Sequence, residues 1–139
     1  LMAPYKIDTM NADGSARARL TINPEDKHPS WSPDGTKLAL SSVRDDDVSR
    51  SLEIYVMNAD GSNQTKITNH PAKDFYPNWS PDGTKIVFYS QRNRNGDIYV
   101  MDPDGANQTR VTIHTTMYGN ASCCGHAVPK DGAEKSRGT

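Results

Sequence analysis

The chain has little of what marks several common classes of protein. Its two cysteines, among 139 residues, are adjacent and give no framework of disulfide bonds. Mean hydropathy is −0.79. The longest apolar runs, such as Ile54–Met57 and Ile86–Tyr89, are far shorter than the roughly 20 residues of a membrane-spanning helix. We therefore expect no insertion into a membrane.

Charge of one sign is lacking as well. The chain has 16 lysines and arginines against 17 aspartates and glutamates, for a net charge of −1. The basic residues are scattered and give no electrostatic footprint for nucleic acid. The motifs GxSxG, HExxH and GxxxxGKS/T do not occur. The sequence thus predicts no catalytic residues, no cofactor and no nucleic-acid partner.

What the sequence does have is an internal repeat. Three segments align without gaps: IDTMNADGSARARLT (7–21), IYVMNADGSNQTKIT (54–68) and IYVMDPDGANQTRVT (98–112), of which the last two agree at 10 of 15 positions. A second block, WSPDGTKLALSS from Trp31, returns as WSPDGTKIVFYS from Trp79. A period in the mid-forties with the composition of β-strands is typical of the four-stranded blade of a β-propeller.

Each repeat predicts four short strands separated by turns. In the last repeat, residues 85–90 (KIVFYS) are rich in branched and aromatic side chains and follow the turn sequence Ser-Pro-Asp-Gly. The glycine after each aspartate is expected to supply the positive φ of a tight hairpin. The predicted fold class is all-β, a partial β-propeller of about three four-stranded antiparallel blades.

The motifs WSPDGTK and IYVMNADGSN, with the short basic strand that ends in threonine, resemble the repeats of TolB-like β-propellers, a WD40-like repeat family. The resemblance covers residues 5–112. It implies blades around a central channel and a role as a periplasmic or extracellular binding platform. It also implies an alternative, because similar repeats form the propeller part of some serine peptidases.

The number of blades leaves the assembly open. Propeller repeats are predicted over 1–112, with a half blade (5–21) and two full blades (26–68 and 74–112), followed by an atypical incomplete repeat or tail (113–139). About three blades cannot close a ring alone, because each blade needs a neighbour on both faces. Either the chain is a fragment of a longer propeller, or two chains dimerise to complete a six-bladed ring.

Candidate binding residues lie on the predicted innermost strands. Strict alternation would place Asp74, Tyr76 and Asn78 on one face, and Phe75, Pro77 and Trp79 on the other. The channel-facing candidates, two from each repeat, are Asp26, His28, Asp74 and Tyr76. The recurring aspartates could form a shared polar or cation site, or could cap the strand starts by accepting bonds from neighbouring backbone amides.

Other repeated positions are interpreted as structural. Packing between blades is expected of the repeated aromatic residues, and tight turns of the repeated glycines: Trp31, Trp79, Tyr55, Tyr99, Gly35 and Gly83. Cys123, Cys124 and His126 are too few for the four ligands of a typical zinc site, so we predict no metal there.

The sequence therefore favours a non-catalytic module that displays rim loops and a central polar channel to a protein partner or small ligand. The loops expected to meet that partner are residues 44–51, 69–73 and 91–96. Self-association as a homodimer is part of this hypothesis. The alternative function is the propeller part of a hydrolase or peptidase, or a hydrolase that uses a site in the channel.

Overall fold

The computed structural model describes residues 6–44, 51–94 and 96–112. Within these ranges the chain is all-β and has no helix, and hence none that is long and apolar enough to span a membrane. Its strands are β1 (Asp8–Thr9), β2 (Ala18–Arg19), β3 (Lys27–Trp31), β4 (Lys37–Ser42), β5 (Glu53–Asn58), β6 (Thr65–Lys66), β7 (Asp74–Trp79), β8 (Ile86–Ser90), β9 (Asp97–Met101) and β10 (Thr109–Arg110).

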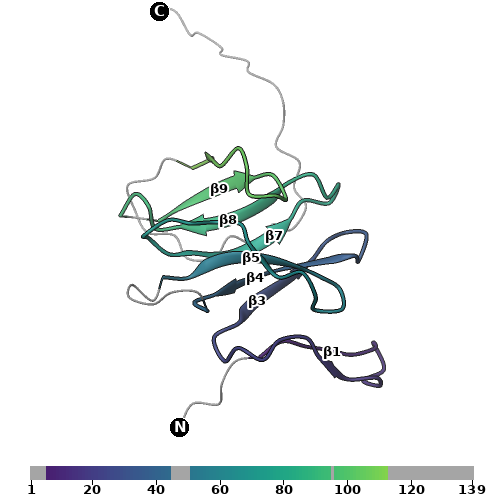
Figure 1. The fold of residues 1–139 in the computed structure, drawn as a ribbon. Coiled ribbons are helices and arrows are strands. Elements are labelled where there is room, and N and C mark those ends of the chain that lie inside the picture. The colour runs from purple at the N-terminus through teal and green to yellow at the C-terminus, as the bar shows by residue number, and fades with distance from the viewer. Residues whose placement is uncertain (1–5, 45–50, 95, 113–139) are drawn as a thin grey trace, which may run out of the picture.

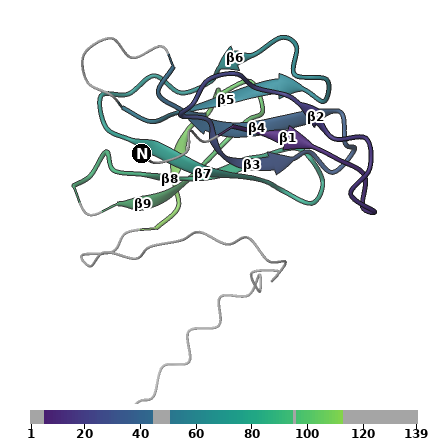
Figure 2. The same ribbon diagram turned by 90° about the horizontal axis from the view of Figure 1, so that it is seen from below.

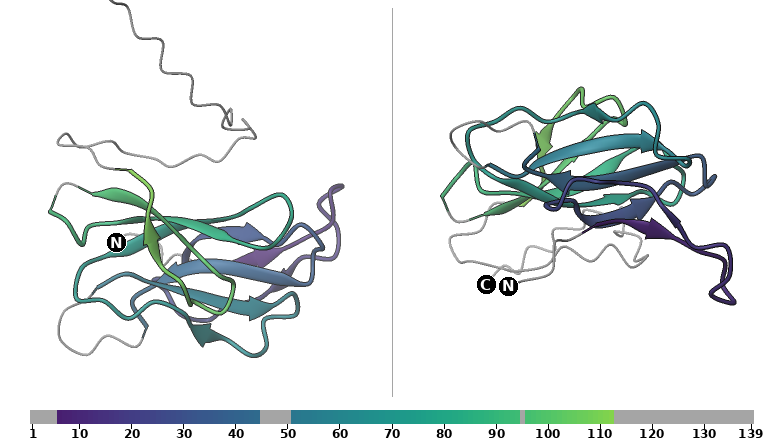
Figure 3. Two further views of the ribbon diagram at one scale, coloured as in Figure 1. Left: turned by 90° about the horizontal axis from the view of Figure 1, so that it is seen from above. Right: turned by 60° about the horizontal axis from the view of Figure 1, so that its bottom comes forward.

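The strands form antiparallel sheets that follow one another as layers (Figure 1). β3 to β6 make one four-stranded sheet in chain order, β7 to β10 make a second, and β1 pairs with β2. Seen from below, the pair β1–β2 lies over β4 (Figure 2). Seen from above, the green strands of the last sheet come to the front (Figure 3). The middle sheet is therefore covered on both faces.

The turns between strands follow from their sequence. Asp34 and Asp82 each accept hydrogen bonds within their own turn, from a serine hydroxyl two residues before at 2.6 Å and a threonine amide two residues after at 3.0 Å. Gly35 and Gly83 follow with φ of +69° and +72°, a region that costs glycine little. Short strands and such turns together produce the meander of each sheet.

The core consists of two apolar layers, because β4 and β5 send alternate side chains to opposite faces. The layer toward β1–β2 contains Ile7, Leu38, Leu40, Tyr55 and Met57. The layer between the two four-stranded sheets contains Ala39, Ile54, Val56, Ile86, Phe88, Tyr99 and Met101. Repeated residues from successive blades thus meet in one core.

The innermost strands depart from the strict alternation predicted for them. A β-bulge interrupts the pairing of β7 with β8 between Phe75 and Asn78, and the equivalent bulge interrupts β3. Phe75 pairs with Tyr89 and Asn78 with Val87, so Phe75 and Asn78 share a face. The predicted separation of faces along residues 74–79 was therefore wrong, because one extra residue reverses the alternation beyond a bulge.

The two tryptophans, predicted to be equivalent, differ in burial. Trp79 packs against the apolar layer between the four-stranded sheets, whereas Trp31 is 45% exposed. The register places Trp31 opposite Leu38, hence on the face toward β1–β2. The described part of that layer has only two short strands, too little to cover an indole. Packing between blades therefore stays a prediction for Trp31. The tail predicted at 113–139, with Cys123, Cys124 and His126, lies outside the described ranges.

Candidate binding site on the inner strands

The bulges on β3 and β7 set the conformation of two candidate residues. His28 has φ of +55° and Tyr76 has φ of +57°, a left-handed conformation that few residues other than glycine adopt. Each is followed by proline, which disfavours right-handed helical backbone in the residue before it. Two blades therefore hold the same strained geometry at the same position.

The two side chains come together from neighbouring blades. The rings of His28 and Tyr76 have centroids 4.1 Å apart, and Phe75 lies 4.9 Å from Tyr76. All three are half-buried. The buried hydroxyl of Ser41 connects His28 and Tyr76, because its Oγ accepts from the backbone N–H of Tyr76 at 3.2 Å and lies 3.3 Å from His28 Nδ1. We call His28, Phe75 and Tyr76 the inner-strand aromatic cluster.

The environment of His28 favours the neutral imidazole. Burial lowers its pKa below the usual 6.5, and the positive charge of Lys27 lowers the pKa further. In the neutral ring, Nδ1 can accept a hydrogen bond from the Ser41 hydroxyl, while the oxygen of that hydroxyl accepts from the backbone N–H of Tyr76. A cavity of about 330 Å³ adjoins the imidazole, lined by Lys6, Ile7, Asp8, Asp26, Lys27, His28 and Pro29.

The two candidate aspartates have partners within the chain. Asp26 is paired with Arg44 at 2.6 Å and Asp74 with Arg92 at 2.6 Å, and both carboxylate side chains are fully buried. Neither of the predicted arrangements, a shared cation site or a cap on neighbouring amides, describes this geometry. The opposite charge that a buried carboxylate requires comes instead from an arginine of the same blade.

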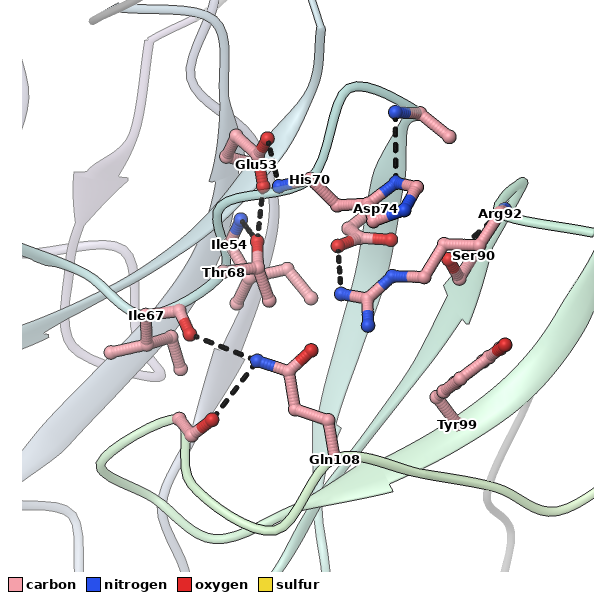
Figure 4. A network of polar contacts seen from close by, with 12 residues as sticks. Glu53, Ile54, Ile67, Thr68, His70, Asp74, Ser90, Arg92, Tyr99 and Gln108 are labelled. Atoms are coloured by element: carbon pink, nitrogen blue, oxygen red, sulfur yellow. Dashed lines mark hydrogen bonds and ion pairs between the residues drawn. The ribbon is translucent and has the colours of Figure 1, made fainter.

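Each arginine also contacts the third strand of its blade. Arg44 lies over the ring of Tyr55, 4.8 Å from its centroid, and Arg92 lies 5.1 Å from that of Tyr99. Aspartate, arginine and tyrosine thus connect the innermost strand to the third strand in both blades, as Figure 4 shows for the second. The sequence analysis missed the arginines, although each stands two residues after the serine that ends the second strand.

In the first full blade this polar chain reaches the turn before the outermost strand. Arg44 donates to the side-chain oxygen of Gln64, whose amide nitrogen donates to the carbonyl of Gly61 at 2.8 Å. Gln108, the equivalent of Gln64, donates to the carbonyls of Gly105 and of Ile67 in the preceding blade, at 2.9 and 3.4 Å. These contacts stabilise the blades and their junction.

A second repeated network joins the third strand to the segment that follows the fourth (Figure 4). The Thr68 hydroxyl accepts from the Ile54 amide at 2.8 Å and donates to Glu53 at 2.5 Å, and Glu53 accepts from the His70 amide at 3.1 Å. Burial raises the pKa of Glu53 above its usual 4.5, against the lowering effect of the Thr68 and His70 bonds. Thr112 occupies the same place against Ile98 in the next blade.

The antiparallel order places the connections at two ends. The connections after β4, β6 and β8, which carry the predicted rim loops, lie at one end, and the Asp-Gly turns lie at the other. Among the residues in 6–44, 51–94 and 96–112, no three His, Cys, Asp or Glu side chains gather as metal ligands would.

Comparisons with known proteins agree with this architecture. Residues 6–128 match the model of the TolB beta propeller domain family. A putative TolB from Agrobacterium tumefaciens is 29% identical, with a TM-score of 0.67 over 76% of this chain and 40% of its own. TolB from Acinetobacter baumannii is 22% identical, with a TM-score of 0.65 over 81% of this chain and 27% of its own.

The similar solved structures also include enzymes. An oligogalacturonate lyase in complex with manganese is 20% identical, with a TM-score of 0.60 over 77% of this chain and 30% of its own. At such identity the likeness shows the fold alone. The chain spans well under half of the TolB structures that it matches. The predicted fold class, a partial all-β propeller, is confirmed, and the chain belongs to the TolB beta propeller domain family.

Proposed function

We propose that the chain is a non-catalytic binding module, in which the inner-strand aromatic cluster and the loops at that end of the blades contact a protein partner or a small ligand. The observation that carries the proposal is the pair of bulges that bring His28 and Tyr76 together. Backbone strain of about 1–3 kcal/mol persists only where the surrounding structure enforces it, and such strain gathers at functional sites. On the inner strands it occurs twice, at the equivalent positions His28 and Tyr76.

The chemistry of the cluster suits recognition. Three half-buried rings offer apolar surface with one phenolic hydroxyl, and the adjoining cavity of about 330 Å³ includes Lys6 and Lys27. Aromatic side chains contribute large contact area to binding sites, and tyrosine adds a hydrogen-bonding group. The buried pairs Asp26–Arg44 and Asp74–Arg92 support the strands beneath and do not contact the ligand in this proposal.

Site-specific photo-crosslinking tests the proposal. Tyr76 is replaced by p-benzoylphenylalanine in cells that make the protein. Ala12, in an exposed turn at the opposite end, is replaced in a matched control. We expect a discrete covalent adduct from position 76 that is lost on adding His28→Ala, and none from position 12. Equal adducts from both positions, or none from position 76, would refute a partner at the inner strands.

Self-association and location follow as parts of the same proposal. Two copies closing one ring would give a solution mass twice the 15.3 kDa of the chain, which light scattering on a size-exclusion peak measures directly. A folded monomer would contradict the two-chain ring. By resemblance to its family we also propose that the protein works in the periplasm or outside the cell, and fractionation of the source cells tests that proposal.

A second candidate function rests on the solved enzymes that share this fold. The tricorn protease, at 20% identity, and a prolyl endopeptidase, at 16% identity, are among the similar structures. In that case the chain would be the propeller part of a hydrolase, or would use a channel site for hydrolysis. A GxSxG hydrolase domain encoded in the same reading frame favours this candidate, and its absence there favours the binding module.

A further inference from the structure

A cleft of about 670 Å³ opens between the two four-stranded sheets at the end that carries the Asp-Gly turns. Its apolar lining comes from Val56 and Ile67 of the first sheet, Trp79 of the second, and two turn prolines, Pro33 and Pro103. This volume and lining fall within the range of pockets that bind ligands, about 300–1,000 Å³. None of the inner-strand aromatic cluster lines it, so this inter-sheet cleft is a separate site.

The rim of the inter-sheet cleft is acidic. Asp34, Asp82 and Asp104 line it from three turns. Hydrogen bonds within the turns, led by those from the preceding serine hydroxyls, lower the pKa of Asp34 and bring the pKa of Asp82 to about 2. The lysine in the lining, Lys37, is bonded through Nζ to Asn58 at 2.8 Å. Negative charge therefore exceeds positive charge at this rim at neutral pH.

Trp79 forms an apolar wall and carries an unused hydrogen-bond donor. Its indole Nε1–H is buried and has no hydrogen-bond partner among the described residues. A buried donor left unpaired costs free energy, so an acceptor that reaches it gains a bond that the protein alone does not make. Trp31, the repeat equivalent, borders no such cleft in the described lining, because the layer beside it has only two short strands.

We propose that the inter-sheet cleft binds a protein partner through a short peptide segment in which one apolar side chain is flanked by lysine or arginine. The apolar side chain enters between Val56, Ile67 and Trp79, and the flanking cations meet the carboxylates of Asp82 and Asp104. Opposite charges across an interface determine which partner is accepted and speed its encounter. The site lies at the opposite end from the rim loops, so one blade pair would contact two partners independently.

Three probe peptides separate the parts of this proposal. They are acetyl-Lys-Leu-Lys-amide, acetyl-Glu-Leu-Glu-amide and acetyl-Lys-Gly-Lys-amide. Each is titrated into the ¹⁵N-labelled full chain while the indole N–H signals are followed by NMR, with Trp31→Phe used for assignment. We expect the Lys-Leu-Lys peptide to shift the Trp79 signal saturably and leave that of Trp31 in place. The Glu-Leu-Glu peptide should bind at least about fivefold more weakly, the effect of one or two screened charge pairs. The Lys-Gly-Lys peptide should also bind at least about fivefold more weakly, because it has no apolar side chain to bury.

Variants at the rim provide the matched control. Asp104→Asn keeps a turn acceptor and removes a rim charge, and should weaken binding of the Lys-Leu-Lys peptide several-fold. Asp60→Asn makes the same change in the equivalent turn of the preceding blade, which does not line the cleft, and should leave binding unchanged. The proposal is overturned if Trp79 does not respond at millimolar peptide, if the glutamate peptide binds as well, or if both variants act alike. None of these results bears on the crosslink from Tyr76, which tests the proposed function separately.

Discussion

Three repeat-equivalent glycines offer a test of how the blades contact one another. Gly14, Gly61 and Gly105 have nearly the same φ, +83°, +85° and +88°. A Cβ at Gly105 would lie 2.2 Å from the carbonyl oxygen of Ile67, and one at Gly61 would lie 2.7 Å from that of Leu20. A Cβ at Gly14 would meet nothing within 4 Å. The glycines thus share a backbone conformation and differ in whether a preceding blade lies against them.

Replacement by alanine separates the two costs. Left-handed backbone costs an L-residue about 1–2 kcal/mol, and this cost is common to all three positions. The close approach to a backbone carbonyl adds about 1–3 kcal/mol of strain, because neither blade can move without disturbing the core between them. We therefore expect Gly14→Ala to lower the free energy of unfolding by about 1–2 kcal/mol and Gly105→Ala by about 2–5 kcal/mol.

Urea denaturation followed by tryptophan fluorescence measures these differences. Asparagine variants add a control, because asparagine tolerates left-handed backbone better than alanine does while still placing a Cβ against the carbonyl. Gly14→Asn should be nearly neutral, and Gly105→Asn should remain destabilising. If the Gly14 and Gly105 variants lose equal stability, the reasoning that blade contact requires glycine at this position is refuted.

Three further predictions concern the polar networks and are tested by denaturation. Arg92→Met should lower the free energy of unfolding by about 3–5 kcal/mol because it leaves Asp74 buried and unpaired, and adding Asp74→Asn should recover part of the loss; no recovery would contradict the pairing. Thr68→Val should cost about 1–3 kcal/mol through the lost bonds to Ile54 and Glu53, whereas Thr65→Val, on the surface, should change little. Burial lowers the pKa of His28 from 6.5 in the folded state. The free energy of unfolding should therefore fall as the pH drops from 6.5 toward the folded-state pKa, and the His28 contribution should be constant above the unfolded pKa of 6.5. A His28→Gln variant with the same pH profile would show that His28 is not responsible.

Much of the fold could be predicted from the sequence because the turns of each repeat form through interactions between residues close together in the chain. Ser-Pro-Asp-Gly and Asn-Ala-Asp-Gly form their turns from bonds within four or five residues, as Asp34 and Asp82 show. The alternation in residues 38–40 and 86–88 then decides which side chains enter which apolar layer. Short-range chemistry and a fixed period were sufficient to predict strands, sheets and the propeller class.

The site depended on contacts that the sequence does not display. The bulges that give His28 and Tyr76 positive φ reversed the predicted alternation, and nothing in residues 74–79 apart from the proline marks an extra residue in the pairing. Asp26 and Asp74 were correctly singled out as recurring, but their arginines stand 18 positions away. The register of the sheets alone brings Asp74 and Arg92 together.

The repeat, the turns and the family follow from the order of amino acids, because they depend on near neighbours along the chain. The role of each repeated residue follows from the packing of the sheets, because equivalent residues meet different neighbours. Trp79 borders a cleft between two complete sheets, while Trp31 faces a pair of short strands and is 45% exposed. Gly105 lies against a carbonyl and Gly14 against none. Residues with the same local sequence therefore contribute different amounts to the free energy of folding, depending on where their blade lies in the stack.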